Sequence, residues 1–382
     1  MDNYAKPILS ATLVRKRAEF DTLAQEWNEL LFTSPANSIF LTFEWLSSWL
    51  DTVYPQADLF VVVVRDHKHK LVGAVPFYLT QFKFVKLITY KYLRYIGDCH
   101  SGAEYPDIII RPGLEDECLT SMRELLLNNR NLWDCAWLPH IADWTGSSER
   151  FAKCFGQDLT FCRRRSASFS SVALPSSLEA YLNGLSKSRR YLLKRQEKYI
   201  TKTHELRFEV CNRHEVIEEY LTQLFNLHGI RWENEGQQGS FVRRPLMADF
   251  YRRFAPLAFQ NDWLCIFRLK LDNVIYAVQY GYVYKGCYHQ VQEGFDPKIS
   301  GVGNILRMRV MEWCITKGIV GYDFLGNHTK HKEDWGSLER CGSQLFLGLS
   351  HRPKNKFLAL REFCPTGRFI DQGRPANFGK SH

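Results

Sequence analysis

A glycine-rich loop ahead of an apolar run is the stretch whose residues most clearly suggest a chemistry. The segment DPKISGVGNILRMRVMEW covers residues 296–313. The first backbone N–H groups of a helix have no internal partners, and the helix dipole attracts an anion to them. Gly301 and Gly303 would let a phosphate approach the backbone, and Lys298 could add a positive charge. The spacing predicts a pyrophosphate cradle, with an ordinary flexible helix start as the alternative. The predicted cradle comprises Lys298, Ser300, Gly301, Val302, Gly303 and Asn304.

Residues that could accept a proton flank this loop. His289 and Glu293 lie on the strand-like segment before it, GCYHQVQEGF, and Asp323 lies on a later one, IVGYDFL. In a regular strand His289 and Glu293 share one face, because successive side chains alternate. Either could serve as a general base, directly or through a water molecule. Polar residues at a solvent-exposed strand end are the alternative interpretation.

Metal binding is not expected. The segment HTKH, residues 328–331, has a His-x-x-His spacing, but no further ligands are evident in the sequence. The 11 cysteines are scattered, and none forms a Cys-x-x-Cys pair. This pattern favours buried, reduced thiols over a disulfide framework or a zinc ribbon.

Two similar arrays of elements must position these residues. The first half has helical patterns at 20–35, 38–53 and 118–128, with strands over 58–80. The second half has a strand at 206–211, helices at 214–227, 243–260 and 303–317, three strands between 263 and 295, and a strand at 319–325. This alternation predicts an α+β fold with α/β layers, in which each half is a mixed, mainly antiparallel sheet flanked by helices.

A Ser-rich segment near 165–178 marks the expected boundary between the halves. We expect an N-terminal half over 1–170, a C-terminal half over 171–350 with a basic helix at 178–202, and a basic tail over 351–382. A loop is expected at HGIRWENEG, residues 228–236. Its Trp232 could line an acceptor pocket or anchor the loop to the core.

Composition and charge narrow the class of protein. Of the 382 residues 45% are hydrophobic, as in a folded globular protein. The net charge is +9, and residues 186–202 carry seven Lys or Arg against one Glu. Such a surface would attract a polyanion, unless it is simply a solvated helix face. No apolar run approaches the ~20 residues that span a bilayer, and the N-terminus lacks a signal peptide's apolar core. We expect a cytoplasmic protein.

The order of these features resembles the GNAT acyltransferase superfamily. Its acyl-CoA loop reads Arg/Gln-x-x-Gly-x-Gly/Ala after the fourth strand, and Lys298, Gly301 and Gly303 match it with lysine in the first position. The chain over 20–348 further resembles the CelD-like acetyltransferases of cellulose biosynthesis, which are related to the FemAB peptidyltransferases. That resemblance rests on SIFLTFEWLSSWLDTV, LVGAVPFYLT, LSKSRRYLLKRQEKYI, LHGIRWENEG and GYDFLGNHTKHKEDWG. It implies two GNAT-like halves, the second carrying the acyl-CoA site.

The last of these segments resembles the family pattern Asp-Phe-Leu-x-Gly-x-x-x-Tyr-Lys-x-x-Trp. The matching residues are Asp323, Phe324, Leu325, Lys332 and Trp335, whereas Asn327 replaces the glycine and His331 replaces the tyrosine. The resemblance implies that Lys332 and Trp335 lie at the substrate site. In many GNAT enzymes a tyrosine after this strand protonates the leaving thiolate. His331 could do so, because imidazole can donate a proton near neutral pH, or it could be an ordinary surface residue.

The resemblance implies an acyl-CoA-dependent N- or O-acyltransferase, with acetyl-CoA or another acyl-CoA as co-substrate and no metal. Attack by an amine or hydroxyl on a thioester needs a base, an oxyanion donor and reactants held close together. The candidate catalytic residues are Glu293, His289, Asp323 and His331. The implied acceptor is a sugar or amine of an envelope or polysaccharide precursor.

Two other classes stay open. A FemAB-like transferase would take an aminoacyl group from tRNA; the basic helix suits an RNA backbone, but such an enzyme needs no pyrophosphate cradle. A non-catalytic basic binding protein would use the scaffold alone. We do not expect nucleic acid as a partner in the leading interpretation.

Overall fold

The computed structural model describes residues 9–84 and 87–362. Within them the chain forms two compact units. Unit 1 comprises the described residues of Met1–Asp98, Ala103–Ala167 and Cys341–His382, and unit 2 comprises Cys99–Gly102 and Ser168–Arg340. The chain therefore returns to unit 1 after residue 340, ten residues before the boundary expected at 350.

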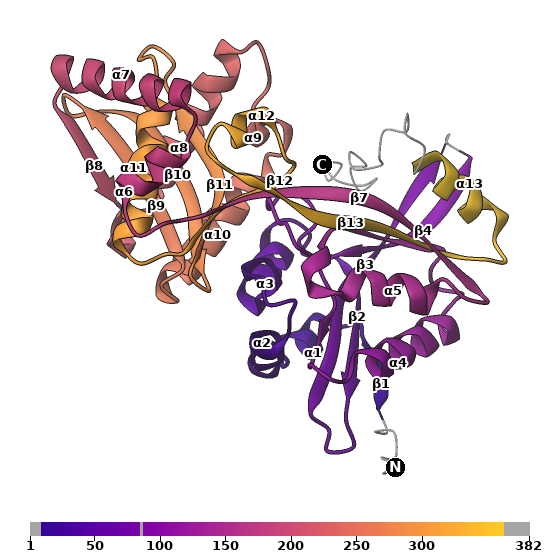
Figure 1. The fold of residues 1–382 in the computed structure, drawn as a ribbon. Coiled ribbons are helices and arrows are strands. Elements are labelled where there is room, and N and C mark those ends of the chain that lie inside the picture. The colour runs from indigo at the N-terminus through magenta and orange to yellow at the C-terminus, as the bar shows by residue number, and fades with distance from the viewer. Residues whose placement is uncertain (1–8, 85–86, 363–382) are drawn as a thin grey trace, which may run out of the picture. The chain divides into compact units, whose positions relative to one another are not determined.

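Unit 1 is built on a mainly antiparallel sheet with helices against it (Figure 1). Its strands are β1 (Ser10–Val14), β2 (Asp58–Arg65), β3 (Leu71–Phe84), β4 (Ile88–Tyr95), β5 (Ile109–Ile110), β6 (Cys135–Ala142) and parts of β7 (Thr160–Ala173) and β13 (Leu338–Leu349). Its helices are α1 (Arg17–Asp21), α2 (Ala24–Thr33), α3 (Phe43–Thr52), α4 (Glu115–Asn128), α5 (Ser147–Phe155) and α13 (Pro353–Glu362), with 3-10 turns at Ile39–Leu41 and Asp143–Thr145. The order β1-β2-β3-β4-β6-β13, with β5 on β3, contains one parallel pair among the described residues, β4 with β6.

Alternate residues of the central strands form the core of unit 1. Phe60, Val62 and Val64 of β2 pack with Cys118 and Met122 of α4 in one buried cluster. The period of two on the strand and the helical spacing of the α4 residues put both sets on facing surfaces.

The strands of unit 2 belong to the same 13-stranded sheet, in the order β7-β12-β11-β10-β9-β8. Its strands are the remaining parts of β7 and β13, together with β8 (Leu206–Val210), β9 (Leu264–Leu271), β10 (Val274–Tyr284), β11 (Cys287–Phe295) and β12 (Gly321–Gly326). Its helices are α6 (Leu178–Gly184), α7 (Lys187–Thr203), α8 (Ile217–Asn234), α9 (Ser240–Arg243), α10 (Leu246–Gln260), α11 (Val302–Thr316) and α12 (Lys330–Glu333), with a 3-10 turn at His214–Val216. The parallel pair among its described residues is β11 with β12.

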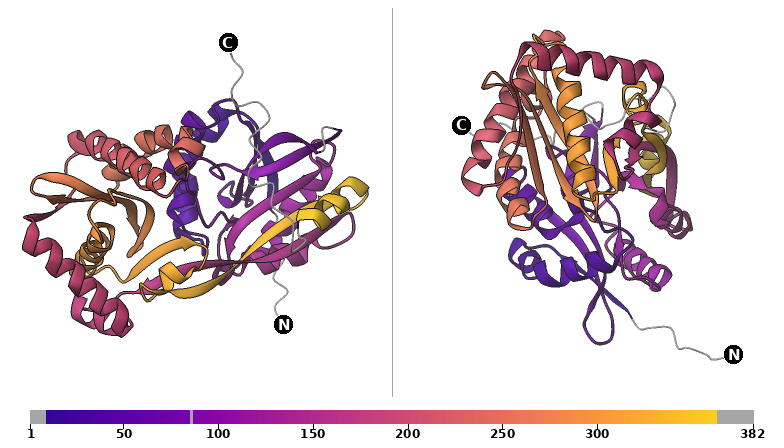
Figure 2. Two further views of the ribbon diagram at one scale, coloured as in Figure 1. Left: turned by 90° about the horizontal axis from the view of Figure 1, so that it is seen from above. Right: turned by 60° about the vertical axis from the view of Figure 1, so that its left-hand side comes forward.

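The two faces of the unit 2 sheet are covered by different helices (Figures 1 and 2). Helices α8 and α10 pack on one face, and α11 packs on the other beneath α6 and α7. The predicted fold class, a mixed and mainly antiparallel α+β fold flanked by helices, is confirmed, although the strands of both units belong to one sheet. No helix among the described residues is long and apolar enough to cross a membrane.

Several local expectations need correction. The Ser-rich segment near 165–178 is largely strand β7, which holds residues of both units. The basic helix expected at 178–202 is two helices, because Leu185 is extended and the Ser186 side chain caps α7 by accepting from the Arg189 N–H. The loop expected at 228–236 is mostly the last turns of α8, and the expected tail contains α13.

Candidate functional site

The loop between β11 and α11 has the predicted order of elements, and α11 begins at Val302. Gly301 takes φ +84°, a conformation that side chains other than glycine rarely adopt. A Cβ on Gly301 would lie 2.4 Å from Gln196 Cδ, and one on Gly303 would lie 2.8 Å from Phe295 Cδ1. The packing around the loop therefore favours glycine at both positions, whether or not a ligand binds there.

A phosphate fits this loop only after one side chain moves. Gln196 of α7 covers the loop, and its Oε1 accepts from Asn304 Nδ2 at 3.0 Å. Because glutamine is flexible and carries two amide N–H donors, it could uncover the backbone or bind the phosphate itself. Lys298 is 85% exposed, with Nζ 3.9 Å from Asp296 Oδ2, and Ser300 is also exposed. Lys298 could thus approach a bound anion from the solvent side.

Strands β11 and β12 pair only at their beginnings. The register partners are Cys287 with Gly321, Tyr288 with Tyr322, and His289 with Asp323. Both strands continue, to Phe295 and Gly326, without further pairing to each other among the described residues. Backbone groups on such parted edges can bond to an extended ligand. The opening lies directly before the glycine loop.

A bulge in β11 changes which residues share a face. Val291 is an extra residue between the pairs that β11 makes with β10. His289 pairs with Tyr282 and Glu293 pairs with Gln279, two positions three residues apart on a regular stretch of β10. Directly paired residues point to the same side, so His289 and Glu293 point to opposite sides. The prediction that they share a face is wrong, because the bulge shifts the alternation by one residue.

Glu293 lies on the α11 side, in a buried ion pair. Arg307 Nη2 donates to its Oε1 and Oε2 at 3.0 and 2.9 Å, and Gln279 Nε2 donates to Oε2 at 2.8 Å. The Glu293 and Arg307 side chains are 5% and 6% exposed. Both carboxylate oxygens are thus engaged by a buried guanidinium. This geometry suits a structural partner of Arg307 better than a base that must reach a substrate.

His331 of α12 joins the same ion pair. Its Nε2 lies 3.1 Å from Arg307 Nη1, a group that can only donate. Burial of the ring, and next the charge of Arg307, lower the pKa of His331, although the residue as a whole is exposed. His331 is therefore neutral near pH 7, with Nε2 accepting from the guanidinium. That atom is poorly placed to protonate a leaving thiolate.

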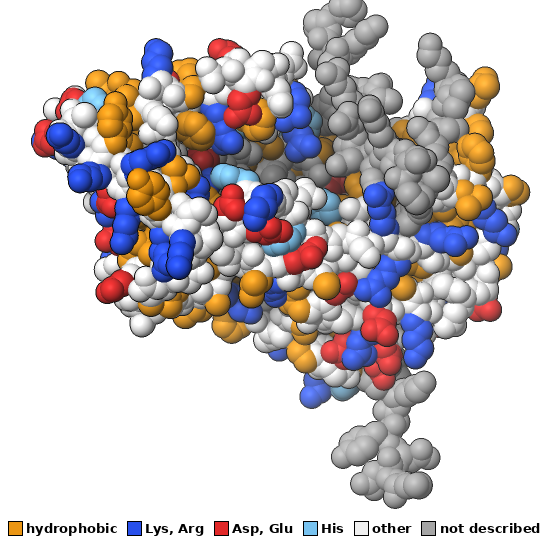
Figure 3. All heavy atoms as spheres, turned by 45° about the horizontal axis from the view of Figure 1, so that its top comes forward, with side chains coloured by type: hydrophobic (Ala, Val, Ile, Leu, Met, Phe, Trp, Pro, Cys, Tyr) orange, Lys and Arg blue, Asp and Glu red, His pale blue; other side chains and the backbone are white. Residues whose placement is uncertain are grey.

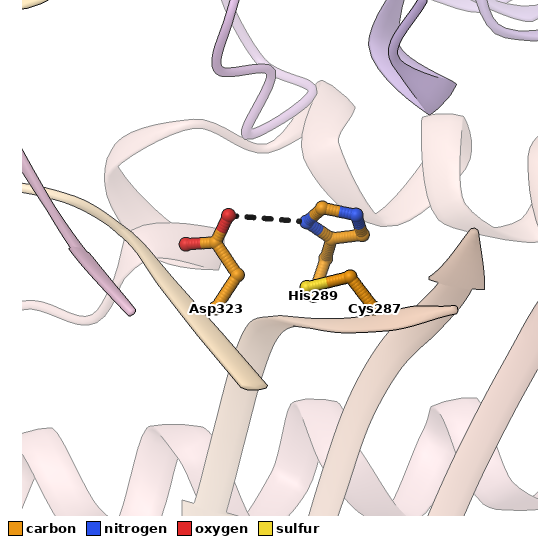
Figure 4. A group of neighbouring side chains, drawn as sticks. All are labelled: Cys287, His289 and Asp323. Atoms are coloured by element: carbon orange, nitrogen blue, oxygen red, sulfur yellow. Dashed lines mark ion pairs between the residues drawn. The ribbon is translucent and has the colours of Figure 1, made fainter. Parts of the chain in front are cut away.

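Cys287, His289 and Asp323 meet on the opposite face of the sheet (Figure 4). His289 Nδ1 lies 3.4 Å from Asp323 Oδ2, and the two side chains are 12% and 4% exposed. Asp323 Oδ1 accepts from the Leu325 N–H at 2.7 Å, which fixes the carboxylate. An aspartate beside Nδ1 favours the tautomer in which Nε2 can take a proton. The pair can act as an oriented general base.

Cys287 was not among the sequence candidates. Its Sγ and the ligand atoms of His289 and Asp323 lie within 4.8 Å of one another. Burial, and next the charge of Asp323, raise the pKa of Cys287 to about 12, so the thiol is protonated at neutral pH. Structural zinc sites use four protein ligands, with any thiol in its ionised form. The described residues supply three ligand groups here, fewer than such a site needs, and we assign no metal to them.

The three residues expected at the substrate site all have packing roles. Lys332 Nζ donates to backbone carbonyls at the end of β12, those of Phe324 (2.8 Å), Leu325 (3.3 Å), Gly326 (2.5 Å) and Asn327 (2.8 Å). Trp335 is fully buried. Trp232 lies on α8, where its Nε1 donates to His228 Nε2 at 3.0 Å. Lys332 therefore fixes the end of the strand that carries Asp323.

The basic helix α7 has a mixed surface. Leu193 and Ile200 are buried against α11, whereas Tyr191 and Tyr199 are 68% and 57% exposed among lysines and arginines. In the space-filling view, Lys and Arg side chains are interspersed with apolar and acidic ones (Figure 3). Exposed aromatic rings among cations are one feature of surfaces that bind single-stranded nucleic acid.

Comparison with known proteins defines the class of fold. Residues 187–333 match the family model described as an acetyltransferase (GNAT) domain, a segment that contains the loop, both parted strands and α7. Over this segment the fold is that of a GNAT acetyltransferase domain. No curated protein sequence matches the chain.

Solved structures extend the likeness of the fold to most of the chain. The chain is similar to FemX with a TM-score of 0.61 and 10% identity, over 88% of this chain and 98% of FemX. It is also similar to a conserved protein of unknown function from Bacteroides thetaiotaomicron, with a TM-score of 0.53 and 12% identity over 88% and 99% of the two chains. At these identities the likeness concerns the fold alone.

Proposed function

We propose that this chain is an acyl-CoA-dependent N- or O-acyltransferase, with acetyl-CoA as the simplest donor. The carrying observation is that β11 and β12 part directly before a glycine loop at the start of α11, inside the segment that matches the GNAT domain. The CelD-like resemblance of the sequence supports an acceptor among sugars or amines of envelope or polysaccharide precursors.

In this proposal, the glycine loop would bind the donor and His289 would transfer the proton. The loop backbone at Gly301 and Val302, with Gln196 and Lys298, would hold the phosphates of the donor. His289, oriented by Asp323, would take the proton from the attacking amine or hydroxyl. Parted backbone N–H groups of β11 would bond to the oxygen of the reacting carbonyl. The thiol of CoA then leaves, protonated from solvent or from the imidazolium.

The direct test is release of free thiol from acetyl-CoA in the presence of a panel of amino sugars, sugar nucleotides and simple amines. We expect release that depends on an acceptor and falls at least tenfold in His289→Ala. Mass spectrometry of small molecules retained by the purified protein would identify the donor independently. A protein that neither binds acetyl-CoA nor releases thiol with any acceptor would contradict the proposal.

A second candidate is a transferase that uses aminoacyl-tRNA. It is favoured by the exposed Tyr191 and Tyr199 on a basic helix, and by Gln196 filling the space over Gly301. It predicts tight, salt-sensitive tRNA binding together with weak or absent CoA binding.

A further inference from the structure

Two arginines pack on the ring of Trp335. The Arg189 Cζ lies 4.3 Å and the Arg307 Cζ 5.0 Å from the centre of the indole ring, and the tryptophan is fully buried. Arg189 comes from α7 and Arg307 from α11, so two helices supply the cations. Stacking on an aromatic face holds a guanidinium in place. Its N–H groups lie in the plane of the guanidinium and can still donate to other partners.

Three buried N–H donors of this group have no acceptor among the described residues. They are Arg189 Nε, Arg307 Nε and Trp335 Nε1. Three of the other guanidinium nitrogens have partners: Arg189 Nη2 donates to Asn304 Oδ1 at 3.0 Å, and the two Arg307 Nη groups contact Glu293 and His331. Leaving a buried donor unsatisfied costs about 1–3 kcal/mol, and such groups are rare in folded proteins. Three in one contacting cluster point to an acceptor-rich ligand.

The local charge points the same way. Glu293 is the carboxylate in contact with Arg307, while Arg231 lies 3.9 Å from the same carboxylate and 3.6 Å from Glu235. No described carboxylate lies within ion-pair distance of Arg189. Burial, and next the charge of Arg307, lower the pKa of Arg189, although Asp334 partly offsets this. The cluster therefore holds a cation that an added anion would stabilise.

We propose that Arg189, Arg307 and Trp335 form a binding site for a phosphate group of a small substrate of the transferase. A phosphate offers three or more acceptor oxygens for three donors, whereas a carboxylate offers two oxygens. The cluster reaches solvent beside Arg189, which is half-buried, and His331, which is exposed. The assignment of the phosphate to a substrate rests on the proposed function. The binding of an anion at this cluster is independent of that function, so it is tested without a transfer assay.

The test is calorimetric titration of the full chain with inorganic phosphate and pyrophosphate. We expect dissociation constants of millimolar or tighter for the wild type, and at least tenfold weaker binding for Arg189→Met. The matched control is Arg195→Met, which removes an exposed charge from the same helix and should change binding less than twofold. Trp335→Phe keeps an aromatic platform but removes the Nε1 donor, and should weaken binding several-fold with an unchanged circular dichroism spectrum.

Two results would overturn the site. One is no heat of binding with either anion. The other is equal weakening of anion binding by Arg189→Met and Arg195→Met, which would indicate general charge attraction. If Trp335→Phe unfolds, the comparison of the two arginine variants still decides. Titration with CoA and with pantetheine, which lacks the phosphates, identifies the source. Weaker CoA binding in Arg189→Met, with pantetheine unchanged, assigns the phosphate to the donor. Unchanged CoA binding, with pyrophosphate binding lost, assigns it to the acceptor.

Discussion

His289 and Glu293 have different surroundings, although they lie only four positions apart on one strand. Glu293 is bound to a buried guanidinium, and His289 lies beside a carboxylate on the next strand, on the other face of the sheet. Both carboxylate oxygens of Glu293 accept hydrogen bonds from Arg307, whereas Asp323 approaches His289 at Nδ1, the arrangement that orients an imidazole as a base. Substitution of His289 should therefore affect turnover, whereas substitution of Glu293 should affect stability.

Replacing His289 with Ala should lower turnover at least tenfold and leave acyl-CoA affinity nearly unchanged, because a general base typically contributes ~10²–10⁴ in rate. Asp323→Asn should produce a smaller loss of turnover, since it removes only the orienting charge. The measurement is steady-state kinetics beside CoA titration. Full activity in folded His289→Ala would place the base elsewhere.

Replacing Glu293 with Gln should mainly destabilise the fold. Arg307 would keep its charge but lose its buried carboxylate, and breaking such a pair from one side costs about 3–5 kcal/mol. Urea-induced unfolding measures this loss. A Glu293→Gln protein that is as stable as the wild type but inactive would restore Glu293 as a catalytic candidate.

Asp107 in unit 1 should make stability depend on pH. Burial raises the pKa of Asp107 to about 6, although hydrogen bonds from Ser147, the Ile108 N–H and Thr145 oppose the shift. The folded state thus keeps the proton at pH values where the unfolded state, with a pKa near 4, has lost it. The free energy of unfolding should fall by about 2–3 kcal/mol between pH ~4 and ~6 and then level off.

Unfolding of wild type and Asp107→Asn across this range checks the prediction. The difference between the two free energies of unfolding should change over the same pH interval, because asparagine cannot titrate. A difference that is independent of pH would show that Asp107 has an ordinary pKa.

At the scale of elements, the glycine loop depends on α7 as much as on its own residues. In Gln196→Ala the atoms nearest to a Cβ on Gly301 are removed, so Gly301→Ala in that background gains room for its Cβ and retains the strain of its positive φ. This double variant should fold but bind acetyl-CoA at least tenfold more weakly than Gln196→Ala alone. Equal affinity of the two proteins, measured by calorimetry, would mean that the loop backbone does not hold the donor.

The strands and helices of unit 2 around the loop were predictable because their apolar periods are regular. Three features were not. Strand β7 is rich in Ser and Arg, so its alternation is weak, and only pairing with β12 reveals it. The β11 bulge leaves no mark in the sequence, yet it reverses the face of every residue after it. Helix α8 continues through Trp232 because its last turns pack against β11.

The residues of the candidate site were partly predictable. The glycine-rich loop pointed to Gly301, and the strand-like segments on either side of it pointed to His289 and Asp323. Arg307 could have been noticed, since it is a charged residue inside the apolar run NILRMRVM, where a buried cation requires a partner. Cys287 could have been placed beside His289, because residues two positions apart on a strand point to the same face. Arg189 and Gln196 could not be placed, because their contacts with the loop arise from the packing of α7 on α11.

For the whole molecule, the net charge of +9 does not by itself identify the partner. Basic residues attract tRNA and the phosphates of CoA alike, but the two differ in their dependence on salt. Each phosphate contact with RNA releases counterions, so tRNA affinity should fall steeply as salt rises. Binding of one CoA relies on few charges and on the loop backbone, so its salt dependence should be shallow.

The measurement that tests the acyl-CoA proposal most directly is a paired titration of the full chain with acetyl-CoA and with total tRNA near physiological salt. We predict acetyl-CoA binding between about 1 μM and 1 mM, the usual range of substrate constants, and no measurable tRNA binding. Tight tRNA binding that weakens steeply with salt, together with no acetyl-CoA binding at millimolar concentration, would contradict the account and favour the aminoacyl-tRNA-dependent transferase.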